Sequence, residues 1–116
     1  MKKVCITVPI ESDMQEKFSS LCRAHGYSAD FRSTDEMKPE DYDGYEVIIG
    51  TPSPSALSKA SALRYLHLSM AGSNAFVQDG VLNHEVLLTN SSGAFGHAIS
   101  EHLMAMLYSL YKKLHL

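Results

Sequence analysis

Five short strand-like runs alternate with helix-like segments, and this alternation constrains the fold more than any other feature of the chain. Four runs are β-branched or rich in leucine, as buried strands are, whereas the second alternates apolar and polar residues like an edge strand. The runs cover residues 4–8, 27–32, 47–50, 65–68 and 86–89. Right-handed β-α-β crossovers then predict an all-parallel sheet with helices on both faces. At 116 residues, one such domain accounts for the chain, residues 1–116.

Five units within this length favour a flavodoxin-like, three-layer αβα fold with strand order 2-1-3-4-5. Capping residues and helical spacing predict helices over residues 13–25 and 54–59, and a brief helical turn over 74–77. The segment 35–46 carries six carboxylates against one lysine and is interpreted as a short solvated helix. The last helix, residues 97–115, has an apolar arc of roughly 200° on a wheel of 100° per residue and therefore needs two apolar neighbours.

The fourth run leads into the small-residue turn Ser69–Ser73. In an open parallel sheet, ligands bind beyond the carboxyl ends of the strands, and Gly72 lets a ligand approach the backbone closely. Uncovered backbone N–H groups in such a turn suit an anion or a carboxylate. The alternative is an ordinary strand-to-helix turn that binds nothing.

Composition and charge argue against several partners and locations. A net charge of −3 and a pI near 6.0 indicate no positively charged surface for binding nucleic acid. Cys5 and Cys22 lie in apolar contexts without a paired spacing, which predicts reduced core residues and a cytoplasmic protein. Pro9 and Glu11 end the first apolar run too early for a signal peptide, and the sequence predicts no membrane span.

Motifs for metal, nucleotide or nucleophile chemistry are missing. His97 and His102 are five residues apart and diverge by about 140° on a helix, so they cannot share a zinc ion as residues at i and i+4 do. We expect no metal. The chain has no G-x-G-x-x-G, Walker or G-x-S-x-G motif, and the loop 9–12 carries an acid where an FMN phosphate would sit.

Several segments together resemble the substrate-binding domain of the D-isomer-specific 2-hydroxyacid dehydrogenases. The matching segments are Glu46–Gly50, Leu63–Gly72, Thr89–Gly93 and the later triplet Ser100-Glu101-His102, in the family's order and spacing. In that family a flavodoxin-like domain stands beside a Rossmann domain that binds NAD, and substrate lies in the cleft between them. The resemblance covers nearly the whole chain.

The resemblance implies roles for particular residues. The backbone N–H groups of Ala71 and Gly72 would hold the substrate carboxylate, and Ile99 would approach the nicotinamide of the cofactor. The helix 97–115 would cross to the cofactor domain. The implied substrate-binding positions are Ser69, Met70, Ala71, Gly72, Thr51, Pro52 and Phe95.

The sequence departs from the family pattern at three positions and lacks the catalytic half. Ser92 stands where many members have proline, Phe95 where many have a polar residue, and Asn74 where aspartate is frequent. The family's catalytic arginine, glutamate and histidine and its glycine-rich fingerprint would all lie beyond the last residue of this sequence. We therefore expect a truncated or isolated domain that has no catalytic residue, binds no cofactor by itself and does not transfer hydride; NAD or NADP belongs to the full-length member. The alternative is a free-standing flavodoxin-like module that binds small carboxylates or a protein partner.

Loss of the cofactor domain would leave part of the helix 97–115 facing water. We expect a homodimer through these residues, because a patch of several large apolar side chains exceeds what soluble monomers usually tolerate. The helix can fold back on its own sheet and pair through the remaining stripe, or exchange with a partner's helix as a domain swap. The sequence decides neither this choice nor which 2-hydroxy acid is the substrate.

Overall fold

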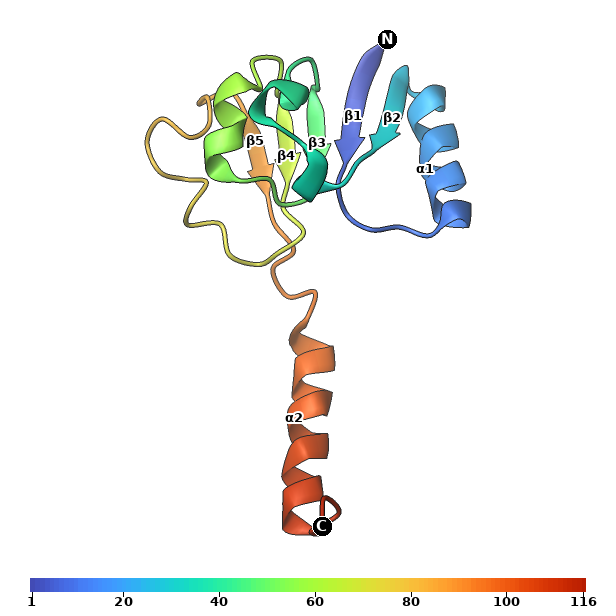
Figure 1. Cartoon of the computed structure of the whole chain (residues 1–116), viewed down its shortest axis with the longest axis vertical. Coiled ribbons are helices and arrows are strands. Elements are labelled where there is room, and N and C mark those ends of the chain that lie inside the picture. Colours follow the sequence, from blue (N-terminus) through green and yellow to red (C-terminus); the bar gives the residue numbers. More distant parts are fainter.

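A single parallel sheet organises the structure, a computed structural model that describes residues 1–116 (Figure 1). Its strands are β1 (Lys2–Ile6), β2 (Tyr27–Phe31), β3 (Val47–Ile49), β4 (Tyr65–His67) and β5 (Leu87–Thr89). They lie in the order β2-β1-β3-β4-β5, and every neighbouring pair is parallel. The predicted α/β class and the predicted strand order are thereby confirmed.

The chain has two α-helices and three short 3-10 helices. They are α1 (Ser12–Ala24), η1 (Thr34–Glu36), η2 (Pro39–Tyr42), η3 (Pro54–Lys59) and α2 (Gly96–Tyr111). Helix α1 and the 3-10 helices lie between strands, and α2 follows β5. None of these helices combines the length and the apolarity that a membrane crossing requires.

Two predicted boundaries were wrong. The first strand covers Lys2–Ile6 and not residues 4–8, because Lys2 and Lys3 pair with the start of β2. At residues 74–77, where a brief helical turn was predicted, the structure has a single turn, in which the Phe76 N–H donates to the Ser73 carbonyl at 2.9 Å. The last helix ends at Tyr111 and not at residue 115, since Lys113 takes a left-handed φ of 58°.

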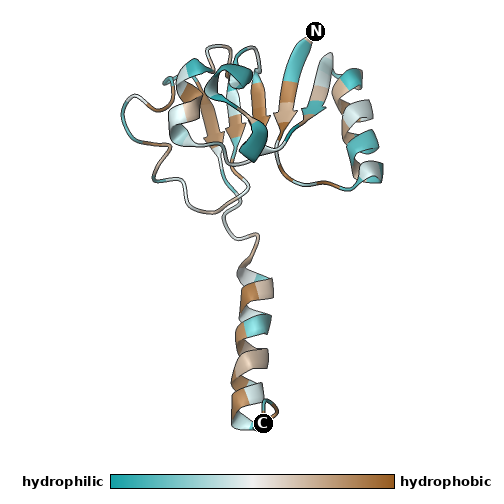
Figure 2. Cartoon of the chain, viewed as in Figure 1, coloured by the Kyte–Doolittle hydropathy of each residue, from teal (hydrophilic) through white to brown (hydrophobic).

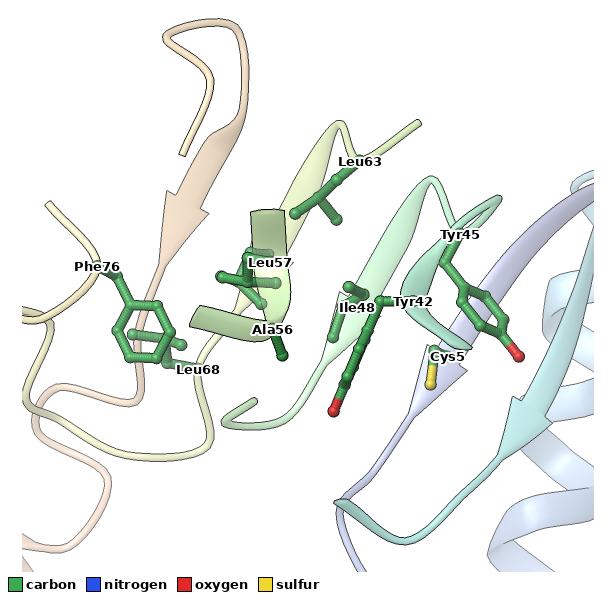
Figure 3. Close-up of a cluster of buried hydrophobic side chains, with 10 residues drawn as sticks. Cys5, Tyr42, Tyr45, Ile48, Ala56, Leu57, Leu63, Leu68 and Phe76 are labelled. Carbon is green, nitrogen blue, oxygen red and sulfur yellow. The ribbon is translucent and has the colours of Figure 1, made fainter. Parts of the chain in front are cut away.

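One face of the sheet carries the hydrophobic core (Figure 3). Cys5, Ile48 and Leu66 occupy one row of the strand register, and each is 0% exposed. Residues that pair in register point to the same face, so this row forms the floor of the core. The side chains that cover it come from the connecting segments and include Tyr42, Tyr45, Ala56, Leu57, Leu63, Leu68 and Phe76.

The acidic segment 35–46 contributes to this core, although the sequence predicted a solvated short helix there. It forms η1 and η2, and Tyr42 and Tyr45 are 1% and 4% exposed. The Tyr45 hydroxyl donates to Asp30 Oδ2 at 2.8 Å. Burial, reinforced by this hydrogen bond, raises the pKa of Tyr45 to about 12. Burial also raises the pKa of the Cys5 thiol to about 11.

The opposite face of the sheet is only partly covered. Helix α1 lies beside β2 at one edge (Figure 1), and it buries none of its residues completely. Across β3, β4 and β5 the side chains on this face stay partly or largely exposed; they are Val47, Ile49, Tyr65, His67, Leu87 and Thr89. Only the C-terminal part of α1, at Leu21, comes near this face, where it lines a groove with Val47.

Helix α2 leaves the body of the domain altogether. Figure 1 shows it leading away from the carboxyl edge of the sheet, and none of its residues is buried. The radius of gyration is 17.9 Å, whereas a compact domain of this length has about 13 Å. Figure 2 shows apolar residues along the projecting helix, so an apolar element stands in solvent.

Candidate carboxylate-binding turn

The turn Ser69–Gly72 lies at the carboxyl edge of the sheet, immediately after β4 and Leu68. Because all the strands are parallel, the segments that follow β3 and β5 leave at the same edge. These are Gly50–Pro52 after β3 and Asn90–Ser91 after β5. Two loops distant in sequence therefore flank the turn.

Hydrogen bonds from both neighbouring loops fix the turn. The Asn90 Nδ2 amide donates to the Ala71 carbonyl at 2.6 Å, and the Ser91 N–H donates to the Met70 carbonyl at 3.1 Å. On the other side, the hydroxyls of Thr51 and Ser69 share a hydrogen bond of 2.8 Å. The carbonyls of the turn are thus held by protein groups, which orients the peptide planes and their N–H groups.

The N–H groups of Ala71 and Gly72 donate to no acceptor within the chain. Both residues are exposed. A Cβ on Gly72 would approach the Met70 methyl group to 3.3 Å, which is a tight contact. Two adjacent backbone donors that face solvent in an oriented turn can bind one carboxylate or another small anion.

The other predicted positions fall into two groups. Thr51 and Ser69 contact each other beside the turn, whereas the side chain of Pro52 is almost fully buried. Phe95 immediately precedes α2 and Ile99 lies within it, with 47% and 57% of these residues exposed. The structure places both residues on the projecting arm, and neither takes part in the hydrogen bonds that fix the turn.

A polar network next to the turn was not predicted from the sequence. Thr89 Oγ1 lies 2.8 Å from His67 Nδ1 and 2.9 Å from the Tyr65 hydroxyl. Ser91 Oγ lies 3.5 Å from His67 Nε2 and donates to the Leu68 carbonyl at 2.9 Å. Tyr65 and His67 are two apart on one strand, and Thr89 pairs with His67 in the parallel register, so strand periodicity was the signal for this cluster.

This network positions side chains and does not form a hydrolytic triad. The Ser91 proton is directed at the Leu68 carbonyl, and the second nitrogen of His67 is held by a threonine where a triad has a carboxylate. No group of three histidine, cysteine or acidic side chains is placed to hold a metal ion. The polar groups join β4 to β5 below the turn.

No arginine reaches the turn. Arg64 precedes β4 and therefore lies at the opposite edge of the sheet, while Arg32 pairs with Asp41 at 3.8 Å. A carboxylate here would be held by backbone donors and hydroxyls only. A bidentate pair with a guanidinium group would bind it more strongly. We therefore expect weak binding.

Comparison with models of protein families found no match to this chain, and no curated protein sequence matched it.

Proposed function

We propose that this chain is the substrate-binding domain of an NAD-dependent D-2-hydroxyacid dehydrogenase and contributes half of a cleft for a 2-hydroxy or 2-oxo acid. The observation that carries the proposal is the pair of unoccupied N–H donors at Ala71 and Gly72, at the carboxyl edge of a 2-1-3-4-5 sheet. The segments around this turn are those that resemble the family. Their role is to bind and orient the carboxylate.

The residues of this chain do not fit the dinucleotide that such a reaction needs. The loop after β1 contains Pro9 and Glu11, and Glu11 is the residue that precedes α1. A carboxylate at a helix N-terminus repels the phosphates that glycine-rich loops bind there. No step of hydride transfer is assigned to the side chains of this chain.

A second candidate is a free-standing module that binds small carboxylates. The same exposed donors of Ala71 and Gly72 support it, because binding through them needs no second domain. The coding region that follows Leu116 distinguishes the two. A glycine-rich Rossmann sequence in the same reading frame favours the dehydrogenase, and a stop codon favours the free-standing module.

Titration with a small 2-oxo acid should shift the amide NMR signals of Ala71 and Gly72, with a Kd in the millimolar range. Two backbone hydrogen bonds without an arginine supply only about 4 kcal/mol after association costs. Ala71→Pro removes one donor and should abolish the shift at Gly72. Ala75→Pro, which changes an alanine in the same exposed loop, is the matched control and should retain binding. Shifts confined to the acidic segment 35–46 would show that the site is misassigned.

The 116-residue chain should not bind NADH or oxidise a 2-hydroxy acid. The reason is the acid beside α1 and the lack of a glycine-rich phosphate loop. Fluorescence titration with NADH is the measurement. A Kd in the low micromolar range would contradict the proposal that this chain does not bind the cofactor by itself. Binding of the 2-oxo acid in the same preparation verifies that the domain is folded.

A further inference from the structure

Helix α2 is an apolar element without a partner. Eight of its large apolar side chains, from Ile99 to Tyr111, are each 46–78% exposed. A 16-residue helix in water is only marginally stable by itself. Its stability must therefore come from burial of these side chains against another surface.

The sheet offers an uncovered surface that is apolar in part, beside the polar cluster of Tyr65, His67 and Thr89. Val47, Ile49 and Leu87 lie on the face that α1 leaves open, and Leu87 is 63% exposed. An apolar groove of about 260 Å³ runs between α1 and this face and is lined in part by Val4, Leu21 and Val47. Purely parallel sheets are normally covered on both faces, so one helix is missing from this face.

We propose that two copies of this chain form a reciprocal domain swap, in which α2 of each copy packs on the open β3-β4-β5 face of the other. Each chain carries both an unpartnered helix and an unpartnered face. A two-fold symmetric exchange therefore covers the helix and the face of both chains. Residues 92–95, which link the clamped Ser91 to α2, act as the hinge. This inference does not depend on the carboxylate site.

The position of α2 favours exchange over a return to its own sheet, because the helix stands clear of that sheet and none of its residues is buried. A sheet face covers a helix stripe of about 100°, and α2 is apolar over about twice that width on the helical wheel. A helix that folded back on its own sheet would also need a second copy to cover the other half of the arc, so the arc requires a dimer in either form. In the reciprocal dimer, that half packs between the two exchanged helices.

The area available is that of a stable dimer. The transfer free energy of a large apolar side chain, divided by about 25 cal/mol per Å², shows that fully burying it removes about 60–120 Å² of apolar surface from water. We count five such side chains on each exchanged helix and an equal area on the sheet face that it covers. The dimer has two such helix-to-sheet contacts, so its interface buries about 1,200–2,400 Å². Stable interfaces bury about 1,200–2,000 Å².

Sedimentation equilibrium at tens of micromolar should give twice the chain mass of 12.8 kDa. Two variants test the two surfaces: Leu103→Lys with Leu107→Lys changes the helix, and Leu87→Lys changes the sheet face. All three leucines are 58–63% exposed, so the substitutions spare the fold of the domain. Each variant should raise the dimer Kd at least tenfold. Val77→Lys, at a residue 64% exposed in the loop after Phe76, is the matched control and should leave the Kd unchanged.

Mixing the two variants provides the decisive measurement. A mixed dimer joins the intact face of one chain to the intact helix of the other, whereas each variant alone has both contacts impaired. The mixture should therefore associate more tightly than either variant alone. A wild-type monomer would overturn the proposal. So would an undiminished Leu87→Lys dimer, which would indicate simple helix-to-helix pairing.

Discussion

Replacing Gly50 by alanine should lower the free energy of unfolding by about 2–5 kcal/mol, through backbone strain and steric overlap together. Gly50 follows β3 with a φ of 142°, a conformation that side-chain-bearing residues rarely adopt. A Cβ at this position would overlap the Thr7 hydroxyl and lie 3.2 Å from the Thr7 Cβ. Thr7 has little room to move, since it is 9% exposed and its N–H donates to the Ile49 carbonyl at 2.9 Å.

Urea unfolding followed by circular dichroism measures this loss, and Gly44→Ala is its control. Gly44 also has a positive φ, 85°, but a Cβ there meets no atom within 4 Å. Gly44→Ala should therefore cost only the strain of a left-handed residue, about 1–2 kcal/mol. Adding Thr7→Ala to Gly50→Ala should recover part of the stability, because it removes the overlapping hydroxyl. Equal losses for the two single alanine variants would contradict the predicted overlap.

Stability should fall steeply as the pH rises from about 9 to about 12. Burial raises the pKa of Cys5 from 9.0 to about 11, and burial with the Asp30 hydrogen bond raises the pKa of Tyr45 from 10.0 to about 12. Both groups are neutral when protonated. The folded state therefore keeps the proton better than the unfolded state, and the stabilisation is complete below pH 9.

The Cys5 contribution is lost between pH 9 and about 11, and the Tyr45 contribution between pH 10 and about 12. Two pKa units on a side chain that is 0% exposed correspond to about 3 kcal/mol for Cys5 alone. Urea midpoints at pH 8, 10 and 11 measure this effect. Cys5→Ala should remove the part of the decline that begins near pH 9, whereas Cys22→Ala should retain it. A Cys5→Ala chain that loses stability as wild type does would refute the assignment.

Much of the fold follows from local pattern. Short apolar runs bounded by proline, glycine and helix caps located four strands to within two residues, because a buried strand needs a continuous apolar run whatever packs on it; the alternation of apolar and polar residues located the edge strand β2. The strand order also followed, since right-handed crossovers between five such units leave few alternatives. Helix α2 was equally visible, because its apolar spacing is a property of the helix alone.

Boundaries and burial depended on partners that the local pattern does not contain. Lys2 and Lys3 belong to β1 because β2 pairs with them, although their side chains resemble a solvated terminus. Tyr42 and Tyr45 lie in a segment crowded with carboxylates, yet η2 folds them over Cys5 and Ile48. The cluster of Tyr65, His67 and Thr89 exists only once β4 and β5 are in register.

For the candidate site, too, the sequence predicted one part and the tertiary structure decided the other. The small residues Ser69–Gly72 after a strand predicted a turn with uncovered N–H groups, because neither glycine nor alanine shields the backbone. Only the tertiary structure decided that Asn90 and Ser91 hold the carbonyls of this turn, while the Ala71 and Gly72 donors face solvent. It also decided that α2 stands clear of the sheet. A sequence specifies that a helix has an apolar side, but the surface that buries it is set by how distant segments, or a second chain, come together.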